Sequence, residues 1–243
     1  MEDLDQYVLQ DIISFMDKDT QMIIRRINSQ FSKYIEPAFV HPLTSEKYLD
    51  LTNLNIYMLY ELCGYSGSLR LLKKLKDINI DFIMAYACQG GNIDMVNLMI
   101  ARGACHWNWG LERACAGNNP DIADMMIQHG AYSFDSCLLF ACSSNSRQLV
   151  DKMITLGATD FDGGLAYACL YGHRTLAEYM ISKGAVLMNW GLLMACRGGH
   201  IELVKLMISY GANDFENAMN CTSYQTPISK EIVEYINNHI QKI

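Results

Sequence analysis

The sequence predicts an all-α protein built from stacked helix pairs, and three observations support this fold class. An Ala-Cys pair recurs every 27 residues without insertion, at Ala87, Ala114, Ala141, Ala168 and Ala195. A Met-Ile-x-x-Gly-Ala block recurs at the same period, beginning at Met99, Met126, Met153, Met180 and Met207. Apolar residues within each unit fall at helical spacing. Because one such unit cannot bury its apolar face alone, the copies are expected to stack as a solenoid.

Residues 191–212 show the two helices of one unit most clearly. The apolar residues of the first helix lie at i, i+3 and i+4, at Leu192, Ala195 and Cys196. Those of the second helix lie at i, i+1, i+4 and i+5, at Leu203, Val204, Met207 and Ile208. Gly198-Gly199 is predicted to form the turn between them, and Gly211 to end the second helix in a left-handed conformation.

The pattern Leu-x-x-Ala-Cys-x-x-Gly-His-x-x-Leu-Val-x-x-Met-Ile-x-x-Gly-Ala resembles the ankyrin repeat over roughly residues 54–243. The family's Thr-Pro-Leu-His opening is replaced by forms such as Trp109-Gly110-Leu111-Glu112. The unit of 27 residues is also shorter than the family's usual length of about 33. The missing residues lie where an ankyrin protein extends a β-hairpin, so we expect shortened loops and a shallow groove.

Composition limits the class of partner and the compartment. The chain has 243 residues, is 51% hydrophobic and carries a formal charge of −7, which is unlike a nucleic-acid-binding protein. An acidic start with no long apolar run leads us to expect no secretory signal, no membrane span and an intracellular, cytoplasmic location. The column cysteines are read as buried small hydrophobes, since helix axes about 8–10 Å apart exceed the reach of a disulfide.

Residues 1–42 do not follow the repeat and are predicted to form a small helical module. A leading Leu, a helix, the turn Asp17-Lys-Asp19 and Ile27-Asn-Ser-Gln-Phe31 together resemble an F-box. That resemblance implies docking onto the Skp-family adaptor of cullin-type ubiquitin ligases. The implied contact residues are Leu4, Leu9, Ile13, Met16, Ile27 and Phe31. The alternative is a helical cap that shields the apolar end of the stack.

The rest of the chain divides into three segments. Residues 43–79 contain a linker helix and a degenerate first repeat, and residues 80–214 contain five regular repeats. Residues 215–243 repeat the frame with an insertion around Pro227 and bring polar side chains to its end. We predict that this last segment is a C-terminal capping repeat.

Two columns of the first helix vary while their neighbours are fixed, and in ankyrin proteins these positions line the concave, partner-binding face. The predicted binding residues are Tyr86, Gln89, Arg113, Phe140, Tyr167, Leu170, Met194 and Arg197. Aromatic and arginine side chains are typical of binding hot spots. The alternative is that these residues only pack against the next unit.

A second aromatic column is expected in the inter-repeat loops, where each side chain would cover a joint between units. It consists of Trp107, Phe134, Phe161, Met188 and Phe215. Trp109 and Trp190 occur in only two of these segments, and are therefore more open candidates for partner contact.

The sequence shows no catalytic constellation, and we expect neither enzyme activity nor a cofactor. No Cys-x-x-Cys or His-x3-His motif suggests a metal site, and Cys105-His106 stands as a solitary pair. His173 and His200 occupy a turn position where their side chains are expected to bond nearby backbone.

The leading functional hypothesis is a substrate receptor that holds a target protein on its repeats and engages a ubiquitin-ligase adaptor. An F-box-like segment joined to ankyrin-like units resembles proteins encoded by large DNA viruses, which implies a host protein as the target. The alternative is a scaffold or decoy that binds a protein with no link to ubiquitin.

Overall fold

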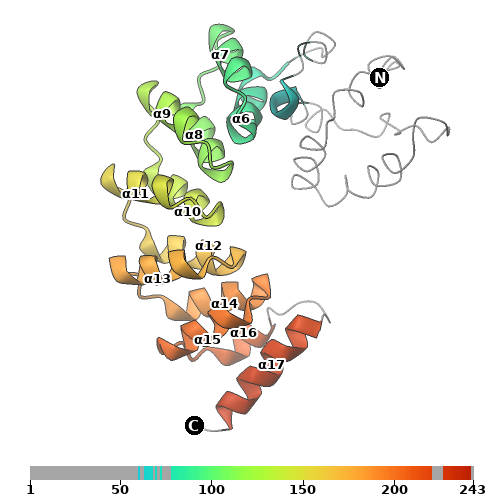
Figure 1. Cartoon of the computed structure of the whole chain (residues 1–243), viewed down its shortest axis with the longest axis vertical. Helices are drawn as coiled ribbons and strands as arrows, with labels where there is room; N and C mark the ends of the chain where they lie inside the picture. The colour runs from blue at the N-terminus through green and yellow to red at the C-terminus, as the bar shows by residue number, and fades with distance from the viewer. Residues whose placement is uncertain are drawn as a thin grey trace, which may run out of the picture. The chain divides into compact units, whose positions relative to one another are not determined.

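The computed structural model describes residues 60, 63–67, 69, 72, 78–220 and 227–241. It divides into two units, Met1–Ala114 and Cys115–Ile243, with the boundary inside helix α8 (Trp107–Ala116). The F-box-like residues and most of the predicted first repeat lie outside the described residues. We describe each unit by itself (Figure 1).

The described part of the first unit contains one complete helix pair and most of α8. The pair consists of α6 (Ile80–Gly90) and α7 (Ile93–Ala101), which pack against each other. Ile83, Ala87 and Cys88 of α6 and Val96 and Met99 of α7 are fully buried. Tyr60, Cys63 and Leu72, from the described part of the preceding segment, are also buried.

The second unit repeats the helix pair. Its first helices are α10 (Phe134–Ser143), α12 (Phe161–Tyr171), α14 (Met188–Gly198) and the short α16 (Phe215–Asn220). Its second helices are α9 (Pro120–Gln128), α11 (Arg147–Thr155), α13 (Arg174–Lys183) and α15 (Ile201–Ser209), followed by α17 (Pro227–Ile240). Consecutive first helices contact each other, and each contacts the second helix of its own pair (Figure 1). The predicted all-α stack of helix pairs is confirmed in the described part of the chain.

Residues at two columns of the repeat have left-handed backbone conformations, and each of these columns lies at the end of a helix. Gly211 has a φ of 93° just after α15, and the equivalent glycine of every regular unit is also left-handed, as the sequence predicts. The turn between the two helices of a pair uses Gly91, Gly172 or Gly199. In the other two repeats, an asparagine takes the same left-handed conformation, at Asn118 and Asn145. Asparagine tolerates positive φ better than most residues with a side chain, so either glycine or asparagine can form this turn.

The Ala-Cys pairs of the first helices, which we call the Ala-Cys ladder, lie on the buried side of these helices; they are Ala87-Cys88, Ala114-Cys115, Ala141-Cys142, Ala168-Cys169 and Ala195-Cys196. Ala141, Ala168, Cys142 and Cys169 have no exposed surface. Burial raises the pKa of the Cys142 and Cys169 thiols to about 12, which keeps them protonated at neutral pH. A Cβ added at Gly164 would lie 2.8 Å from Met180 Sδ, so the second helix fills the space that small residues leave. The predicted role of the column cysteines as buried hydrophobes is confirmed.

The loops between pairs are short, and the described part of the chain contains no strand. One sequence prediction about them is wrong. The second aromatic column does not lie in the loops, because Trp107, Phe134, Phe161, Met188 and Phe215 are the first residues of their helices. In α12 the cause is the preceding residue, Asp160, whose carboxylate accepts from Gly163 N and starts the helix there. All five side chains are half-buried.

The last helix, α17, has one apolar side and one polar side. Ile232 and Ile236 are fully buried, and α17 packs against α15 and α16. Asn237 and Asn238 are exposed. This asymmetry supports the predicted capping repeat, which remains a prediction. No described helix has the length and apolar character needed to cross a membrane.

Candidate functional site

The predicted binding residues lie on the first helices, beside the Ala-Cys ladder. We call this set the first-helix strip, and it comprises Tyr86, Gln89, Arg113, Phe140, Tyr167, Leu170, Met194 and Arg197. Arg197 is exposed and the other members are half-buried. The adjacent alanines and cysteines are almost completely buried, with exposures of 0–3%. The strip therefore marks the edge where the first-helix surface becomes accessible.

In the first unit, the strip is organised around Arg113. Its Nη1 donates a 3.1 Å hydrogen bond to Gln89 Oε1. Its guanidinium lies 5.4 Å from the centre of the Tyr86 ring and 5.9 Å from that of Trp109. Trp109 also meets Phe82 edge-on, with ring centres 4.6 Å apart. Trp109, expected to be open, is thus a half-buried part of this cluster.

In the second unit, the strip carries a row of aromatic rings on α10 and α12. Phe140 and Tyr167 meet edge-on at 6.2 Å, and Tyr167 lies 6.4 Å from Tyr171. Tyr171 is 52% exposed and was missed by sequence reasoning. The available signal was a large residue at a column that carries glycine in other units, for example Gly198. These ring contacts agree both with a partner-binding surface and with packing against the next repeat, since the side chains touch their neighbours and stay partly accessible.

Exposed apolar residues also gather around the start of α14. Val186 and Leu187, in the loop, are 71% and 51% exposed, and Trp190 is 37% exposed. The expectation that Trp190 is open is confirmed, whereas the two loop residues were not predicted. The equivalent loop before α10 exposes Tyr132. Loop tips and the first-helix strip thus both offer apolar surface in the second unit.

Acidic and amide side chains at one column of the repeat hold loops to the preceding first helix. Asp162 Oδ1 accepts hydrogen bonds from the backbone of Val186 and Leu187, both at 2.7 Å. Asp135 makes the equivalent pair of hydrogen bonds one repeat earlier, and Asn189 makes it one repeat later. Because Asn189 does this with an amide, the clamp requires only one side-chain oxygen. We refer to this feature as the loop clamp.

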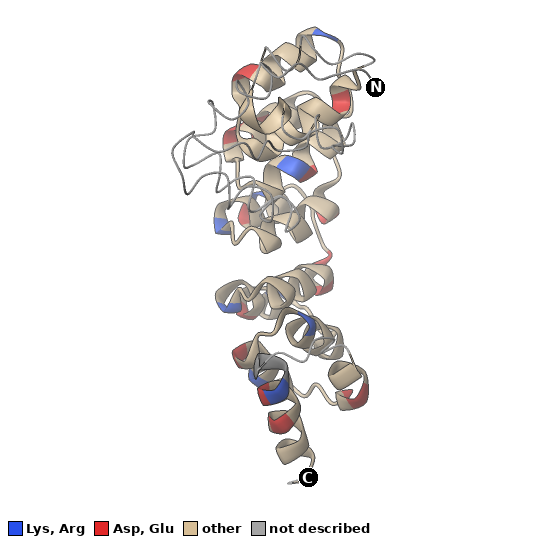
Figure 2. Ribbon diagram, turned by 90° about the vertical axis from the view of Figure 1, so that its right-hand side faces the viewer, with Lys and Arg blue, Asp and Glu red and all other residues tan. Residues whose placement is uncertain are grey.

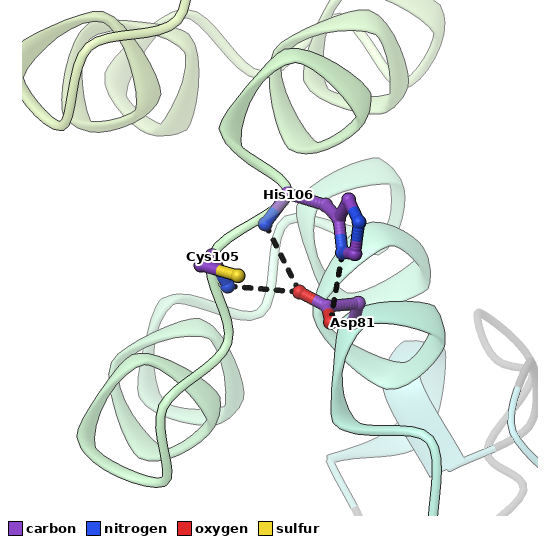
Figure 3. Close-up of side chains that lie close together, drawn as sticks. All are labelled: Asp81, Cys105 and His106. Carbon is purple, nitrogen blue, oxygen red and sulfur yellow. Dashed lines mark hydrogen bonds and ion pairs between the residues drawn. The ribbon is translucent and has the colours of Figure 1, made fainter.

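Asp81 provides the loop clamp of the first unit and makes an additional contact. Its Oδ1 accepts from Cys105 N at 2.8 Å and from His106 N at 3.0 Å. Its Oδ2 lies 2.8 Å from His106 Nδ1 (Figure 3). The expectation that Cys105-His106 is solitary is therefore wrong. The period of the loop clamp, visible as acidic or amide residues every 27 positions, was the signal that pairs Asp81 with this loop.

His173 and His200 connect adjacent helix pairs. His173 Nε2 donates to the Ser143 carbonyl at 2.9 Å, and His200 Nε2 donates to the Leu170 carbonyl at 3.1 Å. Each acceptor lies 30 residues earlier, at the end of the preceding first helix. The expectation of a bond to nearby backbone is therefore wrong for the histidines. It holds for Asn92 of the same column, which accepts from Met95 N, because the shorter amide reaches only its own turn.

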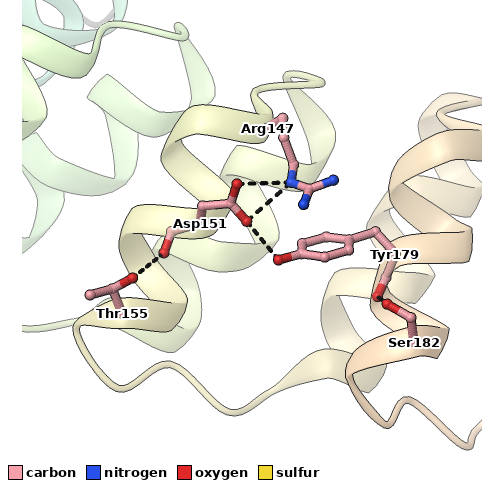
Figure 4. Close-up of polar contacts among 5 residues, drawn as sticks. All are labelled: Arg147, Asp151, Thr155, Tyr179 and Ser182. Carbon is pink, nitrogen blue, oxygen red and sulfur yellow. Dashed lines mark hydrogen bonds and ion pairs between the residues drawn. The ribbon is translucent and has the colours of Figure 1, made fainter.

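The second helices carry a polar network on their exposed side. Arg147 Nε donates to both carboxylate oxygens of Asp151, and the Tyr179 hydroxyl donates to Asp151 Oδ1 at 2.7 Å (Figure 4). The Arg147 guanidinium lies 3.4 Å from the centre of the Tyr179 ring. Partial burial acts to raise the pKa of Asp151, but the bonds from Tyr179 and Arg147 outweigh it and hold this pKa below its ordinary value.

Charge is mixed over the helices of each unit. Figure 2 shows basic and acidic residues interspersed along the described helices. Opposite charges are paired locally, as in Arg174 with Glu178 and Lys152 with Asp124. In these pairs, opposite charges on neighbouring residues offset each other locally.

Among known proteins, the chain matches solved structures but neither a family model nor a curated sequence. A solved structure that is similar to it is the crystal structure of the human ASB11 ankyrin repeat domain. The identity is 19%, the match covers 72% of this chain and 96% of that domain, and the TM-score is 0.48.

Proposed function

We propose that this protein is a protein-interaction module whose repeats hold a partner protein on the first-helix strip. The observation that supports this most directly is the abrupt change in burial across one helix surface. Alanine and cysteine of the ladder are almost fully buried, while the variable aromatic and arginine residues beside them keep accessible surface. The buried ladder residues are the same in every regular repeat, whereas the accessible residues beside them differ from one repeat to the next.

The composition of the strip suits protein recognition. Tyrosine and arginine are enriched among residues that dominate binding energy, and large rings bury much surface with few rotatable bonds. Arg113 is already held by Gln89 and two rings, and Phe140 already rests against Tyr167. Side chains fixed before binding lose less conformational entropy when the partner arrives.

The finer part of the proposal concerns residues 1–42. We infer that this segment links the bound partner to a cullin-type ubiquitin ligase through a Skp-family adaptor. Its support is the F-box-like spacing of apolar residues in the sequence. The adaptor would contact Leu4, Leu9, Ile13, Met16, Ile27 and Phe31.

The setting follows from the same resemblance. An F-box-like segment joined to ankyrin-like units is typical of proteins from large DNA viruses, so the proposed partner is a host protein in the cytoplasm. A protein without the adaptor link would instead act as a scaffold or decoy. The strip would have the same role in that case, which allows the two parts to be tested separately.

Site-directed photo-crosslinking tests the strip. A photoreactive phenylalanine at position 167 should capture a defined partner from cell extract. The same group at position 210, an exposed tyrosine of the second-helix side, serves as the matched control and should not capture it. Changing Phe140 to Ala should reduce capture at 167 at least about 10-fold, as expected for a hot-spot residue. Equal capture at both positions would contradict the proposed surface.

A pull-down with purified adaptor tests the link to ubiquitin. The full-length protein should retain a Skp-family adaptor at micromolar concentration, and a Leu9→Asp, Phe31→Ala double variant should not. Crosslinking at position 167 serves as the control, because it should be unchanged in the double variant. If the parent fails to retain the adaptor at micromolar concentration and the double variant behaves the same, the ligase link is excluded and the scaffold or decoy function remains.

A further inference from the structure

Three side chains with metal-ligating atoms meet where the loop between α7 and α8 lies against α6. Asp81 is in the first turn of α6, and Cys105 and His106 lie in the loop before α8. One carboxylate oxygen, one sulfur and one ring nitrogen lie within 4.8 Å of one another (Figure 3). We propose that Asp81, Cys105 and His106 form a binding site for a divalent transition-metal ion of the zinc class.

The loop clamp alone does not explain this cluster. The clamp is made by backbone N–H groups and one side-chain oxygen, so it sets no requirement on the loop side chains. The equivalent loop pairs are Tyr132-Ser133, Thr159-Asp160, Val186-Leu187 and Asn213-Asp214. The last three of these loops have different side chains, yet Asp135, Asp162 and Asn189 clamp them in the same way. Cysteine and histidine are therefore additional to what the fold needs at this joint.

The clamp nevertheless orients the carboxylate. Oδ1 of Asp81 accepts two backbone hydrogen bonds, which leaves Oδ2 turned toward His106. A ligand whose other atoms are fixed by hydrogen bonds is the usual arrangement around a protein-bound metal. Partial burial acts to raise the pKa of Asp81, yet the bonds from Cys105 N, His106 N and the imidazole hold it below its ordinary value. The carboxylate is thus ionised at neutral pH.

The donor set and its spacing fit a four-coordinate ion. Zinc binds thiolate sulfur at about 2.3 Å and imidazole nitrogen or carboxylate oxygen at about 2.0–2.2 Å, so tetrahedral ligands lie about 3.3–3.7 Å apart. The Asp81 Oδ2–His106 Nδ1 separation is 2.8 Å, and one donor atom from each of the three residues lies within 4.8 Å of the other two. Cys105 and His106 are exposed. Water can therefore supply the fourth ligand, and side-chain rotation can close the site.

Binding changes the protonation of two ligands. The Cys105 thiol releases its proton to solvent, and the His106 ring proton moves from Nδ1 to Nε2, so that the Nδ1 lone pair faces the ion. The ion then replaces the contact between His106 Nδ1 and Asp81 Oδ2. Thiolate and carboxylate together balance its charge of two. Softer ligands of this kind favour zinc or cobalt over magnesium or calcium.

Cobalt titration of the full-length, reduced, chelator-treated protein tests the site. Added Co²⁺ should give the visible bands of a tetrahedral complex with a thiolate-to-cobalt charge-transfer band, and Zn²⁺ should remove them. Cys105→Ser should abolish the charge-transfer band. Asp81→Asn and His106→Gln should each weaken Co²⁺ binding at least about 10-fold. Asp81→Asn should retain the fold, because Asn189 clamps its loop with an amide.

The matched control is Asp162→Asn, which alters an equivalent loop clamp whose loop pair is Val186-Leu187. Its cobalt spectrum should equal that of the parent. Melting by circular dichroism shows that each variant is folded. Two results would overturn the proposal. One is a cobalt spectrum that shows only weak octahedral bands, and the other is a charge-transfer band that survives Cys105→Ser and so comes from another thiol.

Discussion

The two sides of the second unit hold consecutive repeats together in different ways. On the first-helix side, Ala141, Ala168 and their cysteines make a contact without exposed surface. On the second-helix side, Arg147, Asp151 and Tyr179 connect α11 to α13 through hydrogen bonds and a cation–π contact. The first contact depends on the size of the side chains. The second depends on their chemistry, and water competes for it.

This difference explains which positions of the repeat can vary. A larger side chain in the ladder must displace a neighbouring helix, so alanine and cysteine recur in every regular unit. A changed side chain on the exposed side loses at most a solvated contact. The loop clamp is intermediate, since it requires one oxygen but accepts aspartate or asparagine. Substitutions in these three places should therefore differ in cost.

The largest effect is expected in the ladder. Ala168→Leu should lower the free energy of unfolding by about 1–3 kcal/mol, because the added atoms have no space between α10, α12 and α14. Urea denaturation followed by circular dichroism measures the change. A midpoint equal to that of the parent would show that the first helices are not closely packed at this level.

The loop clamp should give the next effect. Asp162→Ala removes the acceptor for two backbone N–H groups and should cost about 1–2 kcal/mol. Asp162→Asn keeps the accepting oxygen, as Asn189 does, and its urea midpoint should lie close to that of the parent. If the two variants lost equal stability, the carboxylate charge would matter more than the hydrogen bonds, contrary to our interpretation.

A smaller, pH-dependent effect is expected at Tyr179. Tyr179→Phe should cost about 0.5–1 kcal/mol at neutral pH, because it removes one hydrogen bond to the Asp151 carboxylate. The pKa of Asp151 is lowered in the folded state, so this stabilisation is present above its unfolded pKa of about 4. It is lost as the pH falls through the lower folded value. Urea midpoints of parent and variant should therefore converge in acid, and a constant difference from neutral to acid pH would argue against Asp151 as the partner.

The smallest effect is expected at Glu178, which pairs with Arg174 on the same helix across 3.0 Å. Both side chains are largely exposed, so Glu178→Ala should change the unfolding free energy by less than about 0.5 kcal/mol. The measurement is the same urea titration. A loss as large as that of Ala168→Leu would remove the distinction between the two sides of the unit.

The sequence predicted the regular features well, because they recur. The period, the helix pairs, the left-handed glycine after each second helix and the buried cysteines all follow from residues that repeat every 27 positions. Helical spacing is a local property, and a buried column repeats its residue type because each copy meets the same neighbours. The placement of the second aromatic column failed, because a single capping residue such as Asp160 moves a helix start.

Contacts between neighbouring repeats were not predictable from the sequence of a single repeat. Asp81 meets a loop 24–25 residues later, and His173 reaches a carbonyl 30 residues earlier. Such pairs depend on how far one helix pair is displaced from the next, a distance that no single unit contains. By itself, the sequence determined which faces are buried and how the chain divides into helices, since both follow from local periodicity. Only the tertiary structure decided which polar side chains meet across a joint, and so brought a carboxylate to Cys105 and His106.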